Sequence, residues 1–318
     1  MADQSKYIWF NGKILPWEKA KIHVMSHVLH YGSGVFEGIK CYLTDKGPAI
    51  FKLSEHIDRL FLSAKKYKME IPFKKESLMQ ACIDTVHLNQ FDECYIRPIA
   101  FYGYDTLGVH PKQCPVEVAI ASFYWGAYLG DEGITNGVNI TISPWKRLSL
   151  ESFPSSAKAS GQYMNSMLAV QDARKNGFDE ALLLNQNDFI AEGSGQNIFI
   201  VKDDIIYTND EESSILMGIT RESIIKICED LNKKVVITNL TKNMLFNADE
   251  AFFTGSASEV TPISTVDKKP IKNGKPGKIT LELKDIYHNI IHGKNSRYLD
   301  WLTFVNLNVP KTEILLED

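Results

Sequence analysis

Apolar residues follow two different spacings along this chain, alternation in some stretches and a helical three-to-four period in others. This pattern predicts short strands mixed with helices. A hairpin is expected at the start, because Asn11-Gly12 between two short apolar runs suits a two-residue type I′ turn. Other strands of the first half are expected over residues 35–42, 49–52, 95–103 and 116–123, with helices from about Ser54 and over about 76–88.

The second half of the chain is also predicted to contain strands mixed with helices. Strands over 181–184, 189–192, 197–202 and 205–208 are expected to form an antiparallel meander, because Asn/Asp-rich turns separate them. Further strands are expected over 138–143, 235–238, 250–254 and 260–266. Helices are expected over about 163–176 and 278–292, and where an apolar stripe runs from Ile224 to Leu231.

Strands and helices alternate without a regular βαβ order, so the predicted fold class is α+β, with two mixed α/β domains. Residues 127–137 contain three glycines and little that could pack, and they are predicted to be the interdomain linker. The chain is thereby divided into a small N-terminal α/β domain over 1–126 and a large C-terminal domain over 138–318.

Composition narrows the class of protein. The 318 residues are 44% hydrophobic, 23% charged and 11% aromatic, which is typical of a soluble globular protein. The net charge of -4 gives no general reason to bind nucleic acid or an anionic membrane, and no apolar run approaches the roughly 18 residues of a membrane span. Five cysteines without a Cys-x-x-Cys pair, and an N-terminal segment unlike a secretory signal, predict reduced thiols in a cytoplasmic protein.

One lysine has an unusual local composition. Lys158 lies among Pro, Ser, Ala and Gly, with no carboxylate within six positions on either side. Small neighbours leave room for a flat, bulky group, and burial would lower the pKa of the lysine and produce an amine nucleophile. A solvated lysine in a flexible linker explains the same composition, and on this segment alone it is the better-supported interpretation.

Two segments of the second half have features of phosphate sites. Residues 218–221 (Gly-Ile-Thr-Arg) start a predicted helix, where free N–H groups and the positive end of the helix dipole favour an anion. A helix capped by Thr220 with no ligand fits this segment equally well. The turn 255–258 (Gly-Ser-Ala-Ser) follows an apolar strand and is also able to present N–H donors.

Three charged residues outside those segments are further candidates. Glu192 ends a predicted strand and is followed by glycines that allow close approach of a ligand, although a lone strand-end glutamate is usually only solvated. Arg97 lies inside an apolar strand, and it therefore needs an anionic partner or an open cavity. Arg59 lies off the apolar stripe of its helix, a position that by itself indicates surface decoration.

Two other motifs are interpreted without a ligand. His23, His27 and His30 have i, i+4, i+7 spacing but lack the glutamate of His-Glu-x-x-His. Packing and hydrogen-bonding histidines are therefore favoured, and no metal is predicted. The Gly-rich segment 32–38 has its third glycine one residue late for a dinucleotide fingerprint and precedes a strand, which argues against a Rossmann site.

Together, a lysine nucleophile, a carboxylate, two phosphate-type turns and an arginine inside a strand suit pyridoxal 5′-phosphate (PLP). Its carbonyl forms a Schiff base with lysine, and its ring nitrogen pairs with an acid. Over nearly its whole length the sequence resembles a branched-chain amino-acid aminotransferase, a class IV aminotransferase of the D-amino-acid aminotransferase-like fold type IV. The motifs, in order, are His-Tyr-Gly at 30–32, Val-Phe-Glu-Gly at 35–38, Glu-His-Ile-Asp-Arg-Leu at 55–60, Tyr-Ile-Arg-Pro at 95–98, Trp-Gly-Ala-Tyr-Leu-Gly at 125–130, Ala-Lys-Ala at 157–159, Glu-Gly at 192–193, Gly-Ile-Thr-Arg at 218–221 and Ala-Asp-Glu at 248–250.

The resemblance implies a PLP site between the two domains, and it implies residue roles. Lys158 would form the Schiff base and then carry a proton between the substrate Cα and the cofactor C4′. Tyr163 would hydrogen-bond the cofactor's phenolic oxygen, and Glu192 would pair with the pyridine nitrogen. The phosphate would be held by Arg59, by the N–H groups of Ile219 and Thr220, and by the hydroxyl of Ser256, where many members have threonine.

The resemblance also implies a pocket that accepts both branched apolar side chains and the glutamate carboxylate. Its residues would be Phe36, Tyr95, Arg97, Trp125, Tyr128, Ala257 and Ser258, with Tyr31, Leu107 and Val109 reaching the site of a neighbouring subunit. A homodimer, or a higher homo-oligomer, would be the active unit. The implied reaction is reversible ping-pong transamination between L-leucine, L-isoleucine or L-valine and 2-oxoglutarate, with pyridoxamine phosphate as the cofactor's form in the second half-reaction.

Other functions of three kinds remain open on the sequence. A D-amino-acid transaminase or an aminodeoxychorismate lyase would share the fold, although Tyr-Ile-Arg at 95–97 and Trp-Gly-Ala-Tyr at 125–128 favour the branched-chain enzyme. A non-enzymatic PLP carrier would bind the cofactor and convert no amino acid. A metal-dependent hydrolase would be built on the three histidines of the segment 23–30.

Overall fold

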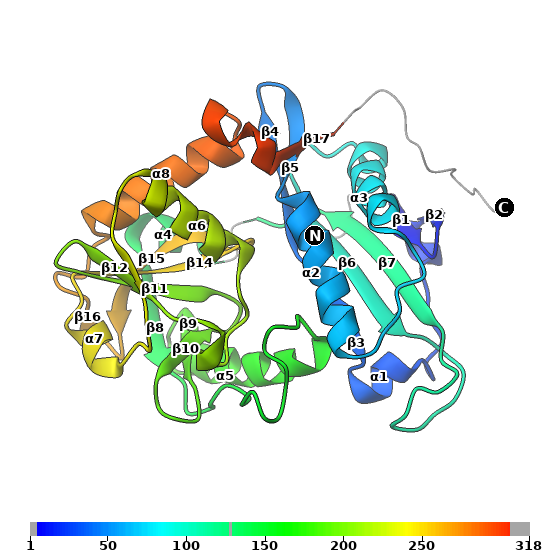
Figure 1. Cartoon of the computed structure of the whole chain (residues 1–318), viewed down its shortest axis with the longest axis horizontal. Helices are drawn as coiled ribbons and strands as arrows, with labels where there is room; N and C mark the ends of the chain where they lie inside the picture. The colour runs from blue at the N-terminus through cyan, green and yellow to red at the C-terminus, as the bar shows by residue number, and fades with distance from the viewer. Residues whose placement is uncertain (1–4, 127–128, 306–318) are drawn as a thin grey trace. The chain divides into compact units, whose positions relative to one another are not determined.

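The computed structural model describes residues 5–126 and 129–305, which fall into two compact units (Figure 1). The first unit comprises Met1–Trp125, Ala157–Gly161 and Asn289–Asp318, and the second comprises Gly126–Ser156 and Gln162–His288. Each unit contains a sheet with helices, so the predicted α+β class is confirmed. No helix in the described part of the chain is long and apolar enough to cross a membrane.

The sheet of the first unit has eight strands among the described residues, in the order β17-β5-β4-β6-β7-β1-β2, with β3 paired to β6. These strands are β1 (Tyr7–Phe10), β2 (Lys13–Pro16), β3 (Gly34–Phe36), β4 (Ile39–Thr44), β5 (Gly47–Phe51), β6 (Cys94–Tyr102), β7 (Val116–Phe123) and β17 (Leu302–Phe304). The short helix α1 (His27–Tyr31) and the longer helices α2 (Leu53–Lys66) and α3 (Lys75–Asn89) complete the unit (Figure 1).

Local sequence explains several of these elements. Asn11 and Gly12 have positive φ angles of 48° and 90°, as a type I′ turn requires, and the predicted hairpin is confirmed. Ile57 and Leu60 of α2 are fully buried, because the apolar stripe of the helix packs into the core that it shares with β4 and β6.

The predicted strand over 35–42 is two strands, β3 and β4, separated at Glu37 and Gly38. Both strands pair with β6 in one continuous register. Glu37 N donates to the carbonyl of Pro98 at 2.8 Å, but proline has no N–H to donate in return. The ladder is therefore interrupted at this point, and the Glu37 side chain lies completely buried in the unit.

The second unit has a nine-stranded sheet in the described residues, in the order β10-β9-β8-β15-β14-β11-β12-β13, with β16 paired to β15. These strands are β8 (Val138–Ile142), β9 (Glu180–Leu184), β10 (Ile190–Gly193), β11 (Asn197–Lys202), β12 (Ile205–Thr208), β13 (Val235–Ile237), β14 (Glu250–Gly255), β15 (Glu259–Val266) and β16 (Lys269–Pro270). The remaining α-helices are α4 (Gly130–Asn136), α5 (Tyr163–Lys175), α6 (Ile219–Asp230), α7 (Lys242–Phe246) and α8 (Lys278–Ile291).

The predicted four-stranded meander over 181–208 is wrong. β9 and β10 form one hairpin and β11 and β12 another, and the strands β8, β15 and β14 separate the two hairpins in the sheet. β11 pairs instead with β14, which lies about fifty residues further along the chain. Strand propensity is local, and it cannot indicate which distant strand becomes the neighbour.

The units also differ from the predicted domains. The chain from residue 289 on, predicted to lie in the domain 138–318, belongs to the first unit, where β17 pairs with β5. Residues 130–136, inside the predicted linker 127–137, form α4, which packs on β15 within the second unit. The segment 157–161, predicted to lie in the domain 138–318, belongs to the first unit. The reason is backbone pairing, since Ala159 forms an antiparallel bridge with Val35 of β3.

Candidate active site

The segment around Lys158 is packed rather than exposed as a flexible linker. Lys158 N donates to the Oγ of the buried Ser63 at 3.0 Å, and Phe36 N donates to the Lys158 carbonyl at 3.0 Å. Ala159 is 2% exposed and joins the core of the first unit. The half-buried side chain lies along an aromatic ring, with Nζ 5.2 Å from the Phe36 ring centroid.

Arg59, predicted to hold a phosphate, pairs with a buried carboxylate that the sequence pattern did not single out. Its Nε lies 2.7 Å from Glu37 Oε1 and its Nη2 lies 2.9 Å from Glu37 Oε2. His56 Nδ1 lies 2.7 Å from the same Oε2. Glu37, His56 and Arg59 all occur within the motifs at 35–38 and 55–60, so a signal was present, although their pairing was not visible in it.

Opposing effects act on the ionisation of this cluster. Burial alone would raise the pKa of Glu37, but the Arg59 guanidinium and His56 outweigh it and hold the pKa of the carboxyl well below its usual range. Burial lowers the pKa of His56, although the neighbouring Glu37 carboxylate acts in the other direction. Glu37 is therefore a carboxylate at neutral pH, and the His56 imidazole is neutral.

Arg97 lies among aromatic rings. Its guanidinium carbon is 4.9 Å from the ring centroid of Phe36, 5.5 Å from that of Tyr95 and 5.9 Å from that of Trp125. The Tyr95 and Trp125 rings meet edge to face at 4.6 Å. Arg97 Nε is buried and has no hydrogen-bond partner among the described residues. These four side chains, which the sequence predicted as substrate-binding, thus provide apolar walls and one cationic group together.

Glu192 in the second unit is held from several sides. It is 5% exposed, and Arg147 Nη2 lies 2.7 Å from its Oε1. Leu216 N donates to its Oε2 at 3.2 Å, and Asn197 Nδ2 lies 3.4 Å from the same oxygen. Arg147 was missed at the sequence level, because nothing around it in the sequence marks a buried cation.

The N-cap residue of helix α6 makes no side-chain hydrogen bond to the first N–H groups of the helix. Its N-cap is Gly218 rather than the Thr220 considered from the sequence, so Thr220 lies inside the first turn. Asn197 connects this start to Glu192, because Asn197 Nδ2 also donates to the Leu216 carbonyl at 2.8 Å. The segment that leads into α6 and the Glu192 carboxylate are consequently joined by hydrogen bonds.

Several buried hydroxyl groups of the second unit lack hydrogen-bond partners within the part of the chain that the structure describes. They include those of Ser155, Thr220 in α6, Thr254 in β14, and Ser258 in the turn between β14 and β15. A buried hydroxyl without a partner is costly, and it indicates a polar group that is supplied from outside the protein.

The predicted site residues are divided between the two units. The first unit contains Tyr31, Phe36, Arg59, Tyr95, Arg97, Leu107, Val109, Trp125 and Lys158. The second contains Tyr163, Glu192, Ile219, Thr220, Ser256, Ala257 and Ser258. Tyr163 is the half-buried first residue of α5, and Ser256 and Ala257 are half-buried after β14. Tyr128 lies outside the described residues.

The three histidines of segment 23–30 make different contacts. The ring nitrogens of His27 lie 2.7 Å from Ser33 Oγ and 2.7 Å from the Gly108 carbonyl. His23 stacks on Tyr104 with ring centroids 4.3 Å apart, and His30 Nε2 lies 3.1 Å from the carbonyl of Val24. His27 thereby connects α1 to the loop that carries Leu107 and Val109.

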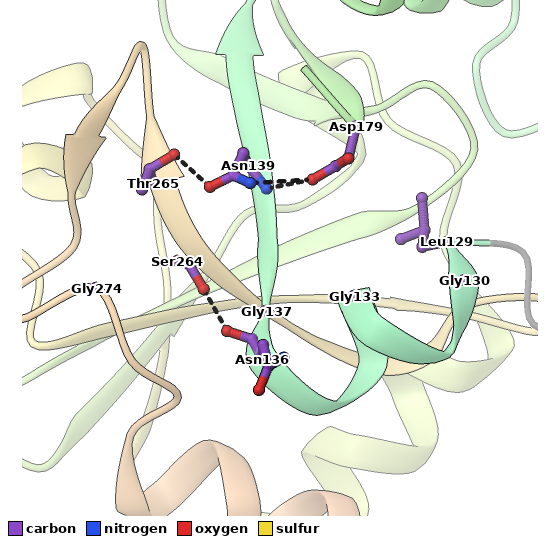
Figure 2. Close-up of a pocket in the computed structure, with 10 residues that line it drawn as sticks. All are labelled: Leu129, Gly130, Gly133, Asn136, Gly137, Asn139, Asp179, Ser264, Thr265 and Gly274. Atoms are coloured by element: carbon purple, nitrogen blue, oxygen red, sulfur yellow. Dashed lines mark hydrogen bonds between the residues drawn. The ribbon is translucent and has the colours of Figure 1, made fainter. Parts of the chain in front are cut away.

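A pocket of about 540 Å³ in the second unit lies between α4, β8 and β15 (Figure 2). None of the predicted site residues lines it. Its polar groups bond to one another: Thr265 Oγ1 donates to Asn139 Oδ1 at 2.9 Å, and Asn139 N donates to Asp179 Oδ2 at 2.8 Å (Figure 2). These bonds connect strands, and they account for the polar lining without a ligand.

Comparisons with known proteins agree with the family that the predicted site residues indicate. The family model of the class IV amino-transferases matches residues 34–266. The chain is 42% identical over 305 residues to a branched-chain-amino-acid aminotransferase of Pseudomonas aeruginosa, covering 96% of this chain and 99% of the relative.

Two solved structures of a branched-chain amino acid aminotransferase from T.th. are similar to the whole fold. One, with pyridoxamine 5′-phosphate, is 46% identical with a TM-score of 0.92, covering 95% of this chain and 99% of that one. The other, complexed with N-(5′-phosphopyridoxyl)-L-glutamate, is 44% identical with a TM-score of 0.90 and the same coverage of both chains.

Proposed function

The chain belongs to the class IV aminotransferase family, and from this premise we propose that it is a PLP-dependent branched-chain-amino-acid transaminase. The amino group of L-leucine, L-isoleucine or L-valine would be transferred to 2-oxoglutarate, giving the branched-chain 2-oxo acid and L-glutamate. The relative in Pseudomonas aeruginosa bears that name, and a similar solved structure contains a phosphopyridoxyl-glutamate adduct. The observation that carries the substrate class is Arg97 among aromatic rings, since it offers one cation within apolar walls.

The residues present fit PLP. The uncapped first turn of α6 and the unpartnered hydroxyls of Thr220, Thr254 and Ser258 can donate to phosphate and hydroxyl oxygens. The buried Glu192 carboxylate suits a protonated ring nitrogen, and Lys158 supplies an amine. When bound, PLP supplies a carbonyl that reacts with amines and a ring that accepts the electron pair of the substrate Cα.

We assign roles to the chain's own residues accordingly. Lys158 Nζ would form the covalent link to the cofactor. Once the substrate amine had taken its place in that link, the freed Lys158 amine would move the proton of the substrate Cα. Glu192 would remain an anion facing the ring nitrogen, and the Tyr163 hydroxyl would donate to the cofactor's phenolic oxygen. The phosphate would be held by Arg59, the N–H groups of Ile219 and Thr220, and the Ser256 hydroxyl.

The substrate would be positioned by two kinds of contact. Phe36, Tyr95 and Trp125 would cover a branched apolar side chain, and Arg97 would bind the side-chain carboxylate of glutamate or 2-oxoglutarate. The N–H groups of Ala257 and Ser258 would bind the α-carboxylate. Tyr128 is proposed as a further wall on the sequence resemblance alone.

The test is the visible spectrum of the purified, PLP-loaded protein before and after addition of L-leucine. A shift of the cofactor band, reversed by 2-oxoglutarate, is the expected result for both half-reactions. A spectrum that changes with D-amino acids but not with L-leucine would replace the proposal with a D-amino-acid transaminase. A PLP band that no amino acid changes would indicate a carrier.

We also propose that the active unit is at least a homodimer. Leu107 and Val109 are 51% and 82% exposed and Tyr31 is 43% exposed, and exposed apolar groups of this kind favour an interface. Analytical ultracentrifugation of the native protein and of a Val109→Asp variant tests this, and a fully active monomer would contradict it.

A cytoplasmic location is proposed because all five cysteines, each in the described residues, are buried free thiols.

Replacement of Gly38 by alanine is expected to raise KM for branched-chain substrates about tenfold or more, with PLP retained. A Cβ on Gly38 would lie 1.8 Å from Tyr95 Oη and 2.7 Å from Tyr95 Cζ, so the ring would move from its place against Trp125. Steady-state kinetics with L-leucine and L-glutamate measures the effect. Tyr95→Phe, which removes only the hydroxyl, is the control and should have the smaller effect; equal effects would show that the ring does not move.

A further inference from the structure

We propose that Glu37, supported by His56, is a positioning residue that fixes the Arg59 guanidinium in the orientation that receives a phosphate group. The positioning follows from contacts within the first unit. It rests on the proposed function only in identifying that phosphate as the phosphate of PLP.

The first step is the geometry of the pair. Arg59 contacts both Glu37 oxygens, through Nε at 2.7 Å and through Nη2 at 2.9 Å. Two parallel N–H···O contacts define the plane of the guanidinium, whereas a single contact would let it rotate. Arginine has a long side chain with many rotamers, so a phosphate that meets an already oriented guanidinium loses less conformational entropy on binding.

The second step is burial. Glu37 is 0% exposed, and the Arg59 side chain is 12% exposed. A carboxylate that is completely removed from water is stable only with a cation and further donors, so Glu37 cannot exchange Arg59 for solvent. The opening of the ladder at Pro98 gives Glu37 this buried position, and the same motif therefore fixes both members of the pair.

The third step is the support for Glu37 itself. His56 Nδ1 lies 2.7 Å from Oε2, and His56 is 1% exposed on the same helix as Arg59. Because an ionised carboxylate can only accept, Nδ1 of His56 carries the hydrogen and donates it to Glu37. Oε2 thus accepts from both His56 and Arg59, and the carboxylate plane is fixed as well.

The fourth step connects the helix that carries Arg59 to the segment that carries the reactive amine. Arg59 and Ser63 are one turn apart on α2, and Ser63 Oγ accepts from the backbone N–H of Lys158. One helix, α2, therefore carries the proposed phosphate ligand and also holds the backbone of the proposed nucleophile. A reorientation of Arg59 would weaken binding of the cofactor phosphate without changing the hydrogen bond that holds the Lys158 backbone.

The experiment compares two ligands in Glu37→Gln, a nearly isosteric change that removes the charge. Apoprotein is titrated with PLP and with pyridoxal, which lacks the phosphate, and intrinsic fluorescence is followed. The affinity for PLP is expected to fall about tenfold or more, while that for pyridoxal stays within about twofold. In the background of Arg59→Gln, adding Glu37→Gln should have no further effect on PLP affinity.

Controls separate positioning from stability. Glu180 is also a completely buried, hydrogen-bonded glutamate, and Glu180→Gln should leave the ratio of PLP to pyridoxal affinity unchanged. If Glu37→Gln does not fold, His56→Leu serves instead, since it keeps the ion pair, removes only its support, and should lower the same ratio by a smaller factor.

The inference would be overturned if Glu37→Gln lowered the affinities for PLP and pyridoxal equally, or lowered neither. Failure of the unaltered protein to bind PLP would overturn the proposed function instead. The inference would then be judged with inorganic phosphate, whose binding Glu37→Gln should weaken and Glu180→Gln should not.

Discussion

Lys158→Ala is expected to lower the transamination rate by about 10⁴-fold or more, because it removes both the proposed covalent link and the group that moves the Cα proton. The variant should fold. The hydrogen bonds of Lys158 with Ser63 and Phe36 use its backbone N–H and carbonyl, which alanine retains. Single-turnover kinetics with L-leucine measures the loss, and the visible spectrum of PLP bound to the variant should lack the lysine-dependent band.

Lys40 provides a matched control in the same unit. Its Nζ lies 5.0 Å from the Tyr42 ring centroid, much as Lys158 Nζ lies 5.2 Å from that of Phe36, and both side chains are half-buried. Lys40→Ala should therefore retain normal kinetics. A Lys158→Ala variant that turns over at the normal rate would remove the central residue of the proposed function.

Features encoded by a few neighbouring residues were predictable from the sequence. The Asn11-Gly12 turn has the positive φ angles that its chemistry requires, and the apolar stripe of α2 is buried as its spacing predicts. The resemblance indicated site residues in both halves of the chain, but it gave no contacts between their side chains. Those contacts depend on how distant segments pack.

The missed features join residues that are far apart in sequence. β11 and β12 pair locally as predicted, yet β11 takes β14 rather than β10 as its second neighbour. Lys158 belongs to the first unit because Ala159 bridges to Val35, more than 120 positions away. No periodicity within a short window contains such information, since it reports which face is apolar and not what covers that face.

The partners of the charged residues were also missed, because they too depend on how separate segments pack. Arg59 looked like a surface residue from its helical position alone, because its buried partner Glu37 lies in another element, at a break between strands. Arg147 carried no signal at all, and Glu192 could have been a solvated strand end. A buried ion pair is recognised only when both members are placed, since each charge alone argues for the surface.

Glu192→Gln is expected to have two separable effects, a fall in kcat of about 100-fold and a loss of about 3 kcal/mol in the free energy of unfolding. The first follows from removing the anion that is proposed to face the cofactor's ring nitrogen. The second follows from Arg147, whose side chain is 7% exposed and would be left buried without its carboxylate partner at 2.7 Å. Steady-state kinetics and urea denaturation of the apoprotein measure the two effects independently.

The double variant Glu192→Gln/Arg147→Met distinguishes these causes. Replacing the orphaned guanidinium with an apolar side chain of similar length should recover most of the lost stability, because the buried charge is gone. It should not recover kcat, since the ring nitrogen still lacks its anion. Recovery of kcat together with stability would mean that Glu192 acts only by holding Arg147, and that the acidic partner of the cofactor must be sought among other residues.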